Sequence, residues 1–407
     1  MLPPDDLPPA FGSRALFPSL ADRLSLNHAG VSPLPAPVRA AAAAFLDARA
    51  HAGAPAFLDA VAQRERLRTA IAGLFGADPA GVALGFGTTR GLLDVAYSLD
   101  LGPADRILGF DGEFPANTTP WISAARAMGA RFEPLPLDGF GDGSGVGLAR
   151  VEDALRRGGV RLIAVSAVQF QTGLAMPLRA LAGLAHAHGA LLAVDAIQAC
   201  GAVPLDAAAL GIDWLVTGAH KWLMSVEGAG FTLASPAARA AFVPRMVGWL
   251  SHTDPVRFLV EGEGHLRVGA PLRTGVDTLE GGAANAVGHV ALEASLHLLG
   301  QLGIPAIFAH IQALHDAWEP LFAARGFASL RAPDPAARSG SLCFRVPAHL
   351  HGPALPAAFA RRGVQLALPD GKLRLSPHWP NGLHETTDLA AILDEVVGDA
   401  AVQARAG

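Results

Sequence analysis

The 407-residue chain is predicted to be an α/β protein built on a mainly parallel sheet. Between Val82 and Phe231, short apolar runs alternate with stretches of helical periodicity, which is the βαβ pattern. Two of these runs, Leu191–Val194 and Trp214–Val216, are followed by polar, reactive residues. The length is sufficient for one large core and a smaller second domain.

The elements follow from apolar periodicity and its interruptions. Residues 1–35 are rich in proline and are expected to be extended. The expected strands are Val82–Leu84, Arg106–Phe110, Arg131–Leu135, Leu162–Ala167, Leu191–Val194, Trp214–Val216 and Gly230–Leu233. The expected helices are Pro37–Ala52, Ala56–Phe75, Gly91–Leu99, Thr118–Met128, Gly147–Arg157 and Leu178–Ala187.

A long helix over Gly281–Leu302 is expected to join two domains. This gives a large domain over 36–280 and a small C-terminal α/β domain over 281–407. The small domain is expected to contain the strands Ser341–Val346 and Lys372–Leu375 and the helix Thr387–Val397.

Composition excludes several classes of protein. Hydrophobic residues make up 51% of the chain, but no apolar run approaches the roughly 20 residues that cross a bilayer. The N-terminus lacks the features of a signal peptide, and Cys200 and Cys343 cannot form a disulfide framework, so we expect a cytoplasmic protein without a membrane partner. A net charge of −5 and the absence of a basic run argue against a nucleic-acid partner. The cysteine spacing is also not a zinc motif, and no metal site is expected.

Asp195 and Lys221 each follow one of the two apolar runs. Because ligands bind beyond the carboxyl ends of parallel strands, the two side chains are expected to face one ligand. Taken singly, such a lysine is ordinarily solvated and such an aspartate is ordinarily a turn or cap residue. Together they suit pyridoxal phosphate (PLP), which needs an amine for its Schiff base and a carboxylate at its pyridine nitrogen.

The string D-x-x-Q at Asp195, followed by G-x-D-x-x-x-x-G-x-H-K-W, resembles the signature of class V aminotransferase-fold enzymes. That group includes selenocysteine lyases, cysteine desulfurases, kynureninases and isopenicillin N epimerases. The resemblance implies PLP fold type I, the aspartate aminotransferase-like fold. It also implies that Lys221 binds PLP, that Asp195 holds the pyridine nitrogen, and that His220 lies near the phosphate. Gln198 is implied near the phenolic oxygen.

The string G-F-G-T-T-R-G begins at Gly85 and precedes a helical pattern. Glycine permits close backbone approach, and Thr88 and Thr89 stand at a helix N-terminus, which favours an anion. An ordinary threonine N-cap is the alternative. By resemblance, the segment binds the cofactor phosphate.

Further cofactor contacts are implied by resemblance. In the string that begins at Gly112, Phe114 is expected to stack on the pyridine ring, with Asn117 nearby, although cysteine desulfurases have histidine in place of Phe114. Either Gln169 or Gln171 contacts the phenolic oxygen, and Gln171 is preferred. Thr217 is also expected to contact the cofactor, although it is one position away from the phosphate-binding serine of desulfurases. Trp249 is expected to donate its indole N–H to the phosphate.

Arg374 matches the family pattern R-x-S-x-x-x-x-N, in which the arginine binds the substrate's α-carboxylate. Residues 1–35 contain Asn27 and His28 in a segment that resembles the one closing over the substrate in relatives. His28 is either an acid or base with a pKa near neutrality or a surface histidine. The segment Leu279–Asn285 resembles an interface string, which implies a homodimer with the active site at the interface, although Ala283 replaces its threonine.

The family resemblance leaves the reaction open. Desulfurases need a mobile cysteine where this chain has Leu366, and kynureninases have tyrosine where it has His220. The expected substrate is a small L-amino acid, which joins the cofactor through its amine and loses its Cα proton to Lys221. A β-eliminating C–S lyase without a persulfide cysteine is the leading hypothesis. An aminotransferase and an epimerase of the isopenicillin N type are the alternatives.

Overall fold

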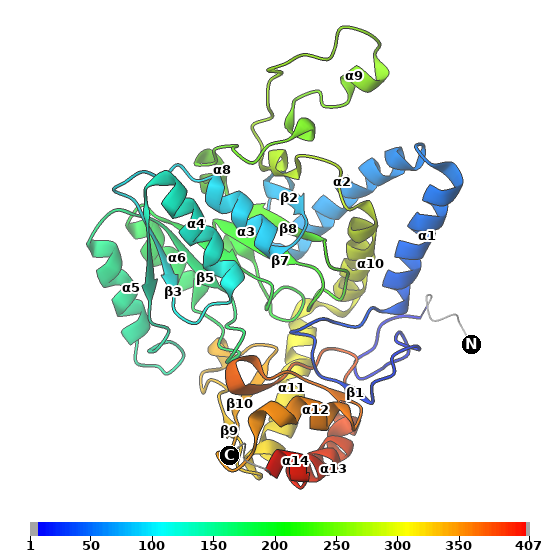
Figure 1. Ribbon diagram of the computed structural model, residues 1–407, viewed down its shortest axis with the longest axis vertical. Coiled ribbons are helices and arrows are strands. Elements are labelled where there is room, and N and C mark those ends of the chain that lie inside the picture. The colour runs from blue at the N-terminus through cyan, green and yellow to red at the C-terminus, as the bar shows by residue number, and fades with distance from the viewer. Residues whose placement is uncertain (1–6, 404–407) are drawn as a thin grey trace.

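The computed structural model describes residues 7–403, without the side chains of residues 56–60 and 260. Its centre is a seven-stranded sheet in the order β2-β8-β7-β6-β5-β3-β4 (Figure 1). The strands are β2 Val82–Gly85, β3 Arg106–Phe110, β4 Arg131–Leu135, β5 Val160–Ser166, β6 Leu191–Asp195, β7 Trp214–Gly218 and β8 Gly230–Ala234. Strand β8 is antiparallel to both of its neighbours, β2 and β7, and all other neighbouring strands of this sheet pair in parallel. The predicted α/β fold with a mainly parallel sheet is confirmed.

Apart from the exposed edge strand β4, the sheet is buried on both faces, which explains why its strands are mainly apolar runs. Along β5, Ile163 and Val165 pack with the cluster that includes α5 and α6. Leu162 and Ala164 point to the opposite face and pack with α3 and α4. The flanking helices are α3 Thr88–Tyr97, α4 Thr119–Met128, α5 Val146–Arg156, α6 Leu178–Ala187 and the short α7 Ala207–Leu210 and α8 Pro236–Ala240.

A second core lies in the C-terminal part of the chain. Its sheet has the order β12-β10-β9, and its other elements include α11 to α14. Leu24 and Leu26 from the N-terminal segment belong to this second core, because β1 pairs in parallel with β11. The bounds are β1 Leu24–Ser25, β9 Ala328–Ser329, β10 Leu342–Arg345, β11 Val364–Gln365, β12 Lys372–Leu375, α11 Ile304–Ala323, α12 Leu355–Ala360, α13 Thr386–Val397 and α14 Ala400–Gln403.

The expected helix over Gly281–Leu302 begins later than predicted. Its counterpart is α10 Ala286–Leu302, where the Asn285 side chain accepts a hydrogen bond from the Gly288 N–H and caps the helix. Helix α10 packs against α1 Ala36–Ala52 and α2 Ala56–Phe75. No single described helix is long and apolar enough to cross a membrane; α10 and α11 pass that test only as a pair bent by 73°.

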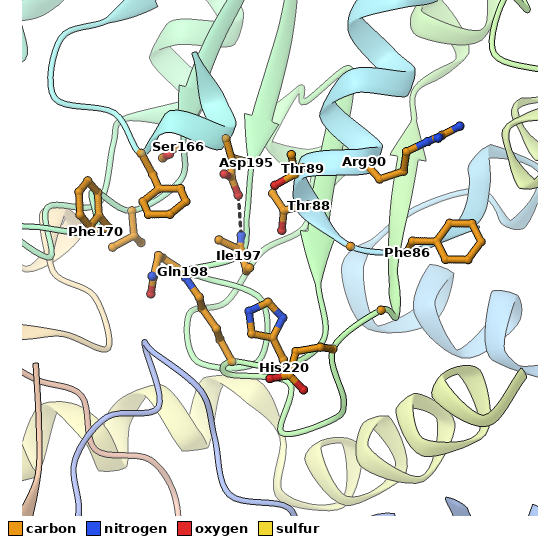
Figure 2. A pocket seen from close by; sticks show the side chains of 17 residues that line it. Phe86, Thr88, Thr89, Arg90, Ser166, Phe170, Asp195, Ile197, Gln198 and His220 are labelled. Carbon is orange, nitrogen blue, oxygen red and sulfur yellow. Dashed lines mark hydrogen bonds between the residues drawn. The ribbon is translucent and has the colours of Figure 1, made fainter. Parts of the chain in front are cut away.

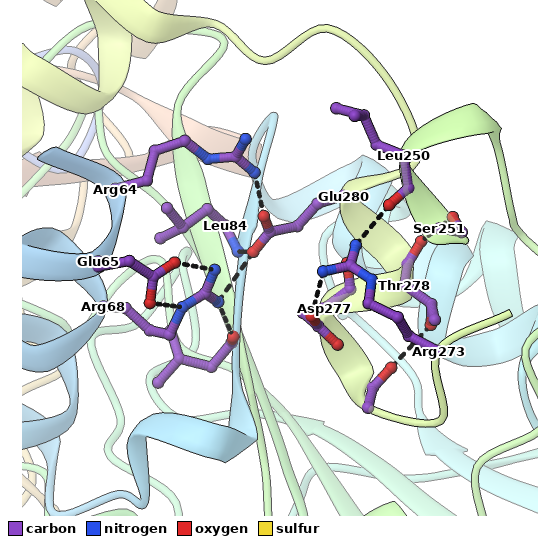
Figure 3. Close-up of polar contacts among 12 residues, drawn as sticks. Arg64, Glu65, Arg68, Leu84, Leu250, Ser251, Arg273, Asp277, Thr278 and Glu280 are labelled. Atoms are coloured by element: carbon purple, nitrogen blue, oxygen red, sulfur yellow. Dashed lines mark hydrogen bonds and ion pairs between the residues drawn. The ribbon is translucent and has the colours of Figure 1, made fainter. Parts of the chain in front are cut away.

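The buried Glu280 explains why the chain before α10 is not part of that helix (Figure 3). Its carboxylate accepts hydrogen bonds from Arg64, from Arg68 at 2.9 Å and from the Leu84 N–H at 2.8 Å. These contacts hold the 3₁₀ turn Val276–Glu280 against α2 and β2. An arm of the chain that carries α9, Arg257–Val260, extends away from the rest of the molecule just before this turn (Figure 1).

Candidate active site

A cavity of about 440 Å³ lies at the carboxyl ends of β5, β6 and β7, beside the N-terminus of α3 (Figure 2). This is the edge where a parallel sheet ordinarily binds ligands. The cavity brings together seven of the residues predicted from the sequence: Thr88, Thr89, Phe114, Asp195, Gln198, His220 and Lys221.

Asp195 and Lys221 are two opposite charges in this cavity, of which Asp195 is buried and Lys221 is half-buried. Asp195 is the last residue of β6, and Lys221 follows the neighbouring strand β7. Burial raises the pKa of Asp195, whereas a hydrogen bond of 3.0 Å from the Ile197 N–H opposes the rise. Burial lowers the pKa of Lys221 to about 8, Asp195 opposes this shift and Arg374 adds to it. Among the described residues no ion pair joins the two groups, so both face the space in which a ligand would bind.

The N-terminus of α3 forms the part of the cavity suited to an anion. Gly87 caps the helix at a φ of 124°, a conformation that a residue with a Cβ rarely adopts. The Thr88 hydroxyl is buried and has no hydrogen-bond partner. Free N–H groups, the helix dipole and an unpartnered hydroxyl together fit a phosphate.

An aromatic wall forms another side of the cavity. The Phe114 ring is 47% exposed, and the Lys221 Nζ lies 5.7 Å from its centroid. Phe170 meets Phe114 edge to face, with the ring centroids 5.3 Å apart. An exposed phenyl face beside the lysine suits stacking on a flat heteroaromatic ring.

Arg374 on β12 is a buried cation without an acidic partner among the described residues. One guanidinium nitrogen, Nη1, donates to the Phe170 carbonyl at 2.9 Å, and Nε has no partner. Burial lowers the pKa of this guanidinium. A buried cation that lacks a counter-ion is stabilised by an anionic ligand, which fits the predicted carboxylate site.

Two residues predicted to contact the cofactor instead form hydrogen bonds with other parts of the protein. The Asn117 side chain is buried, and its oxygen accepts from the Trp121 indole N–H at 3.0 Å. The Thr217 hydroxyl donates to the Gly218 carbonyl at 3.2 Å. Neither residue lines the cavity, so the structure does not place either one as a cofactor contact.

Gln171 and Trp249 also lie away from the cavity. Gln171 donates to the Gly112 carbonyl at 2.9 Å and accepts from Lys372 at 3.1 Å, which turns its amide towards these partners. Gln169 is the glutamine with an unpartnered, buried carbonyl oxygen, so the preference for Gln171 is not supported by the geometry. Trp249 is exposed at the base of the arm.

His28 is buried, so the surface alternative is wrong. Its Nδ1 hydrogen bonds the Ser32 hydroxyl at 2.8 Å, and burial together with His378 lowers its pKa well below 6.5, not near neutrality. The neighbouring Asn27 has a buried, unpartnered carbonyl oxygen. Neither residue lines the cavity, but the Ser32 N–H donates to the His220 carbonyl at 2.9 Å, which fixes the N-terminal segment beside the lysine loop.

The cavity also contains residues that the sequence did not single out, among them Ser166, Phe170, Arg90 and Glu227. Ser166 ends β5, and the strand-end rule that selects Asp195 would have found it. Phe170 carried no such signal, because an isolated phenylalanine most often packs in a core.

A sequence model of the family described as aminotransferase class-V matches residues 25–368. The chain belongs to the class V aminotransferase family. It is therefore a PLP-dependent enzyme, and the cavity's lysine, carboxylate and anion site fit that cofactor.

Individual relatives differ in their reactions. The isopenicillin N epimerase of Streptomyces clavuligerus is 30% identical over 82% of this chain and 84% of its own. A cysteine desulfurase of Klebsiella pneumoniae subsp. pneumoniae is 32% identical over 65% of this chain and 62% of its own. Among solved structures, a cystine C–S lyase in complex with its product cysteine persulfide has a TM-score of 0.83 at 24% identity, covering 94% of this chain and 99% of the other.

The lowered pKa of Lys221 gives a pH prediction. Because only the neutral amine attacks an aldehyde, the rate at which PLP joins the cofactor-free protein should rise with a midpoint near pH 8, not near the ordinary lysine value of about 10.4. In Asp195→Asn the midpoint should fall further, since Asp195 raises the lysine pKa. Stopped-flow absorbance measures both midpoints. An upward shift in Asp195→Asn would contradict this electrostatic description.

Proposed function

We propose that the protein is a β-eliminating C–S lyase that acts on a small L-amino acid without a persulfide-forming cysteine. The observation that carries the proposal is a cavity with Lys221, Asp195 and a nearby unpaired Arg374, but with no thiol among its lining residues. PLP, when bound, supplies the electron sink that makes the Cα proton acidic.

The proposal assigns roles to Lys221, Asp195 and the nearby Arg374. Lys221 holds the cofactor and then takes the Cα proton, for which a pKa of about 8 is well placed at neutral pH. Asp195 keeps the pyridine nitrogen protonated. Arg374 binds the α-carboxylate, which orients the Cα–H bond towards the lysine. The C–S bond then breaks, and sulfur leaves with the bonding electrons.

The state of the two cysteines supports a reaction without a protein persulfide. Cys200 and Cys343 are both buried, and burial raises the pKa of the Cys343 thiol to about 12 and that of Cys200 as well. A buried, protonated thiol is a poor sulfur acceptor. Leu366 occupies the loop position at which desulfurases have their cysteine. The similarity of fold to a cystine C–S lyase is consistent with this proposal.

An epimerase is the second candidate, because the isopenicillin N epimerase relative aligns over most of the chain. Epimerisation by two bases needs a base on one face of Cα and a proton donor on the other. Phe114 has no proton to exchange, which favours the lyase.

Product analysis distinguishes the candidates. The holoenzyme is incubated with L-cystine or an S-alkyl-L-cysteine, without a keto-acid acceptor. Release of pyruvate and ammonia in equal amounts supports the lyase. Conversion of the cofactor to its pyridoxamine form indicates an aminotransferase, and exchange of the Cα proton with loss of optical rotation indicates an epimerase.

We also propose a homodimer with the active site near its interface. The arm exposes several aliphatic side chains, most of all Leu259 at 63%, Leu266 at 81% and Val268, which is fully exposed. An extended arm with exposed aliphatic side chains is typical of a surface that binds another chain. A second copy is the partner that the resemblance of Leu279–Asn285 to an interface string favours.

Sedimentation velocity tests the dimer. Leu259→Asp combined with Leu266→Asp should shift the protein towards monomer, whereas Leu383→Asp, at an exposed leucine outside the arm, should leave the mass unchanged. A wild-type protein that sediments as a fully active monomer would rule the dimer out.

Arg374 gives a prediction on substrate binding. In Arg374→Ala the visible spectrum of the bound cofactor should persist, because the proposed partner of Arg374 is the substrate. Loss of a buried, charge-assisted contact should cost about 2–5 kcal/mol in kcat/KM for amino acids. Amines that lack the carboxylate should react almost as with the wild type. Equal losses for both substrate types would contradict the carboxylate role.

A further inference from the structure

Glu113 is a buried carboxylate directly behind the cavity. One oxygen accepts from the Ser166 N–H at 2.7 Å and from the Gln169 amide at 2.9 Å. The other oxygen accepts from the Ser166 hydroxyl. A group that accepts from three donors has the hydrogen-bonding pattern of an ionised carboxylate.

These contacts connect the two segments that carry the aromatic wall. Phe114 is the residue after Glu113, and Phe170 is the residue after Gln169. The two rings meet edge to face at the cavity, so their relative position depends on the distance between the two segments. Glu113 sets that distance through its bonds to Ser166 and Gln169.

Glu113 also places a negative charge near Asp195. Ser166, which binds Glu113 through both its N–H and its hydroxyl, is paired with Asp195 in the register of β5 and β6. Asp195 has two charged neighbours with opposite effects: Glu113 raises its pKa and Lys221 lowers it. Lys221 is itself influenced by Asp195 and Arg374.

We propose that Glu113 is a positioning residue for the cofactor: it holds the Phe114 and Phe170 rings in place and adds a negative charge behind Asp195. This inference rests on the proposed PLP chemistry of the same cavity. The negative charge of Glu113 repels an unpaired negative charge on Asp195. A protonated pyridine nitrogen relieves this repulsion, so Glu113 strengthens the ion pair between Asp195 and that nitrogen. The charge of Glu113 and the position of the two rings affect the cofactor separately, so each is tested with its own variant.

The charge is tested with Glu113→Gln, which keeps the size of the side chain and removes the charge. The readout is the pH titration of the visible absorbance of bound PLP. Because a nearby negative charge favours the protonated cofactor, the midpoint should fall by about one pH unit.

The geometry is tested with Glu113→Asp, which keeps the charge on a side chain that is one methylene shorter. The midpoint should stay close to that of the wild type, whereas the circular dichroism of the bound cofactor should change and kcat should fall more than KM rises. This variant also keeps the inference testable if Glu113→Gln does not fold.

Different results would overturn the charge role, the positioning role and the proposed function. A Glu113→Gln holoprotein with a lower melting temperature and an unchanged midpoint would show a merely structural residue and would overturn the charge role. A Glu113→Asp protein with wild-type circular dichroism and kcat would overturn the positioning role. A wild-type protein that takes up no PLP would instead refute the proposed function.

Discussion

The whole site depends on keeping two opposite charges, Asp195 and Lys221, in one partly buried cavity. Removing a charge from water costs several kcal/mol, and attraction between opposite charges recovers this only in part. The cost moves both groups towards their neutral forms, as the raised pKa of Asp195 and the lowered pKa of Lys221 indicate. A cofactor that carries a ring nitrogen for the carboxylate and an aldehyde for the amine relieves both penalties at once. The free protein is therefore prepared for its ligand.

The position of Lys221 is fixed by segments far apart in the chain. The Ser32 N–H donates to the His220 carbonyl at 2.9 Å, and His378 Nε2 hydrogen bonds the Trp222 carbonyl at 3.0 Å. The N-terminal and C-terminal parts of the chain thus hold the residues on either side of the lysine. Arg374, the proposed carboxylate site, lies on the same C-terminal part of the chain.

The sequence predicted those elements whose burial produces a recognisable pattern of apolar residues. All seven strands of the large sheet were predicted. Most of them are buried on both faces and are therefore apolar runs, whereas the edge strand β4 is largely exposed and contains polar residues. The placement of Lys221 and Asp195 in one cavity was predicted because both follow expected strands and both belong to the same family motif. The start of α10 was missed, since it depends on the buried Glu280 and its partners from α2 and β2. Glu113 was also missed, because a single glutamate is ordinarily a solvated side chain and its partners come from other elements.

The composition of the aromatic wall bears on the proposed reaction. Desulfurases have a histidine where this chain has Phe114, and a histidine can exchange protons near neutral pH. A phenyl ring can stack on a flat cofactor but cannot exchange protons, so in the proposed reaction Lys221, whose pKa is about 8, takes the Cα proton. Elimination needs one base to remove the Cα proton, and its sulfur leaving group departs as an anion that needs no acid if its own pKa is low. Epimerisation by two bases needs a donor on the opposite face. A cavity in which Phe114 stands beside Lys221, where a proton-exchanging side chain would be needed for inversion, therefore supports the proposed elimination more than inversion of the α-carbon.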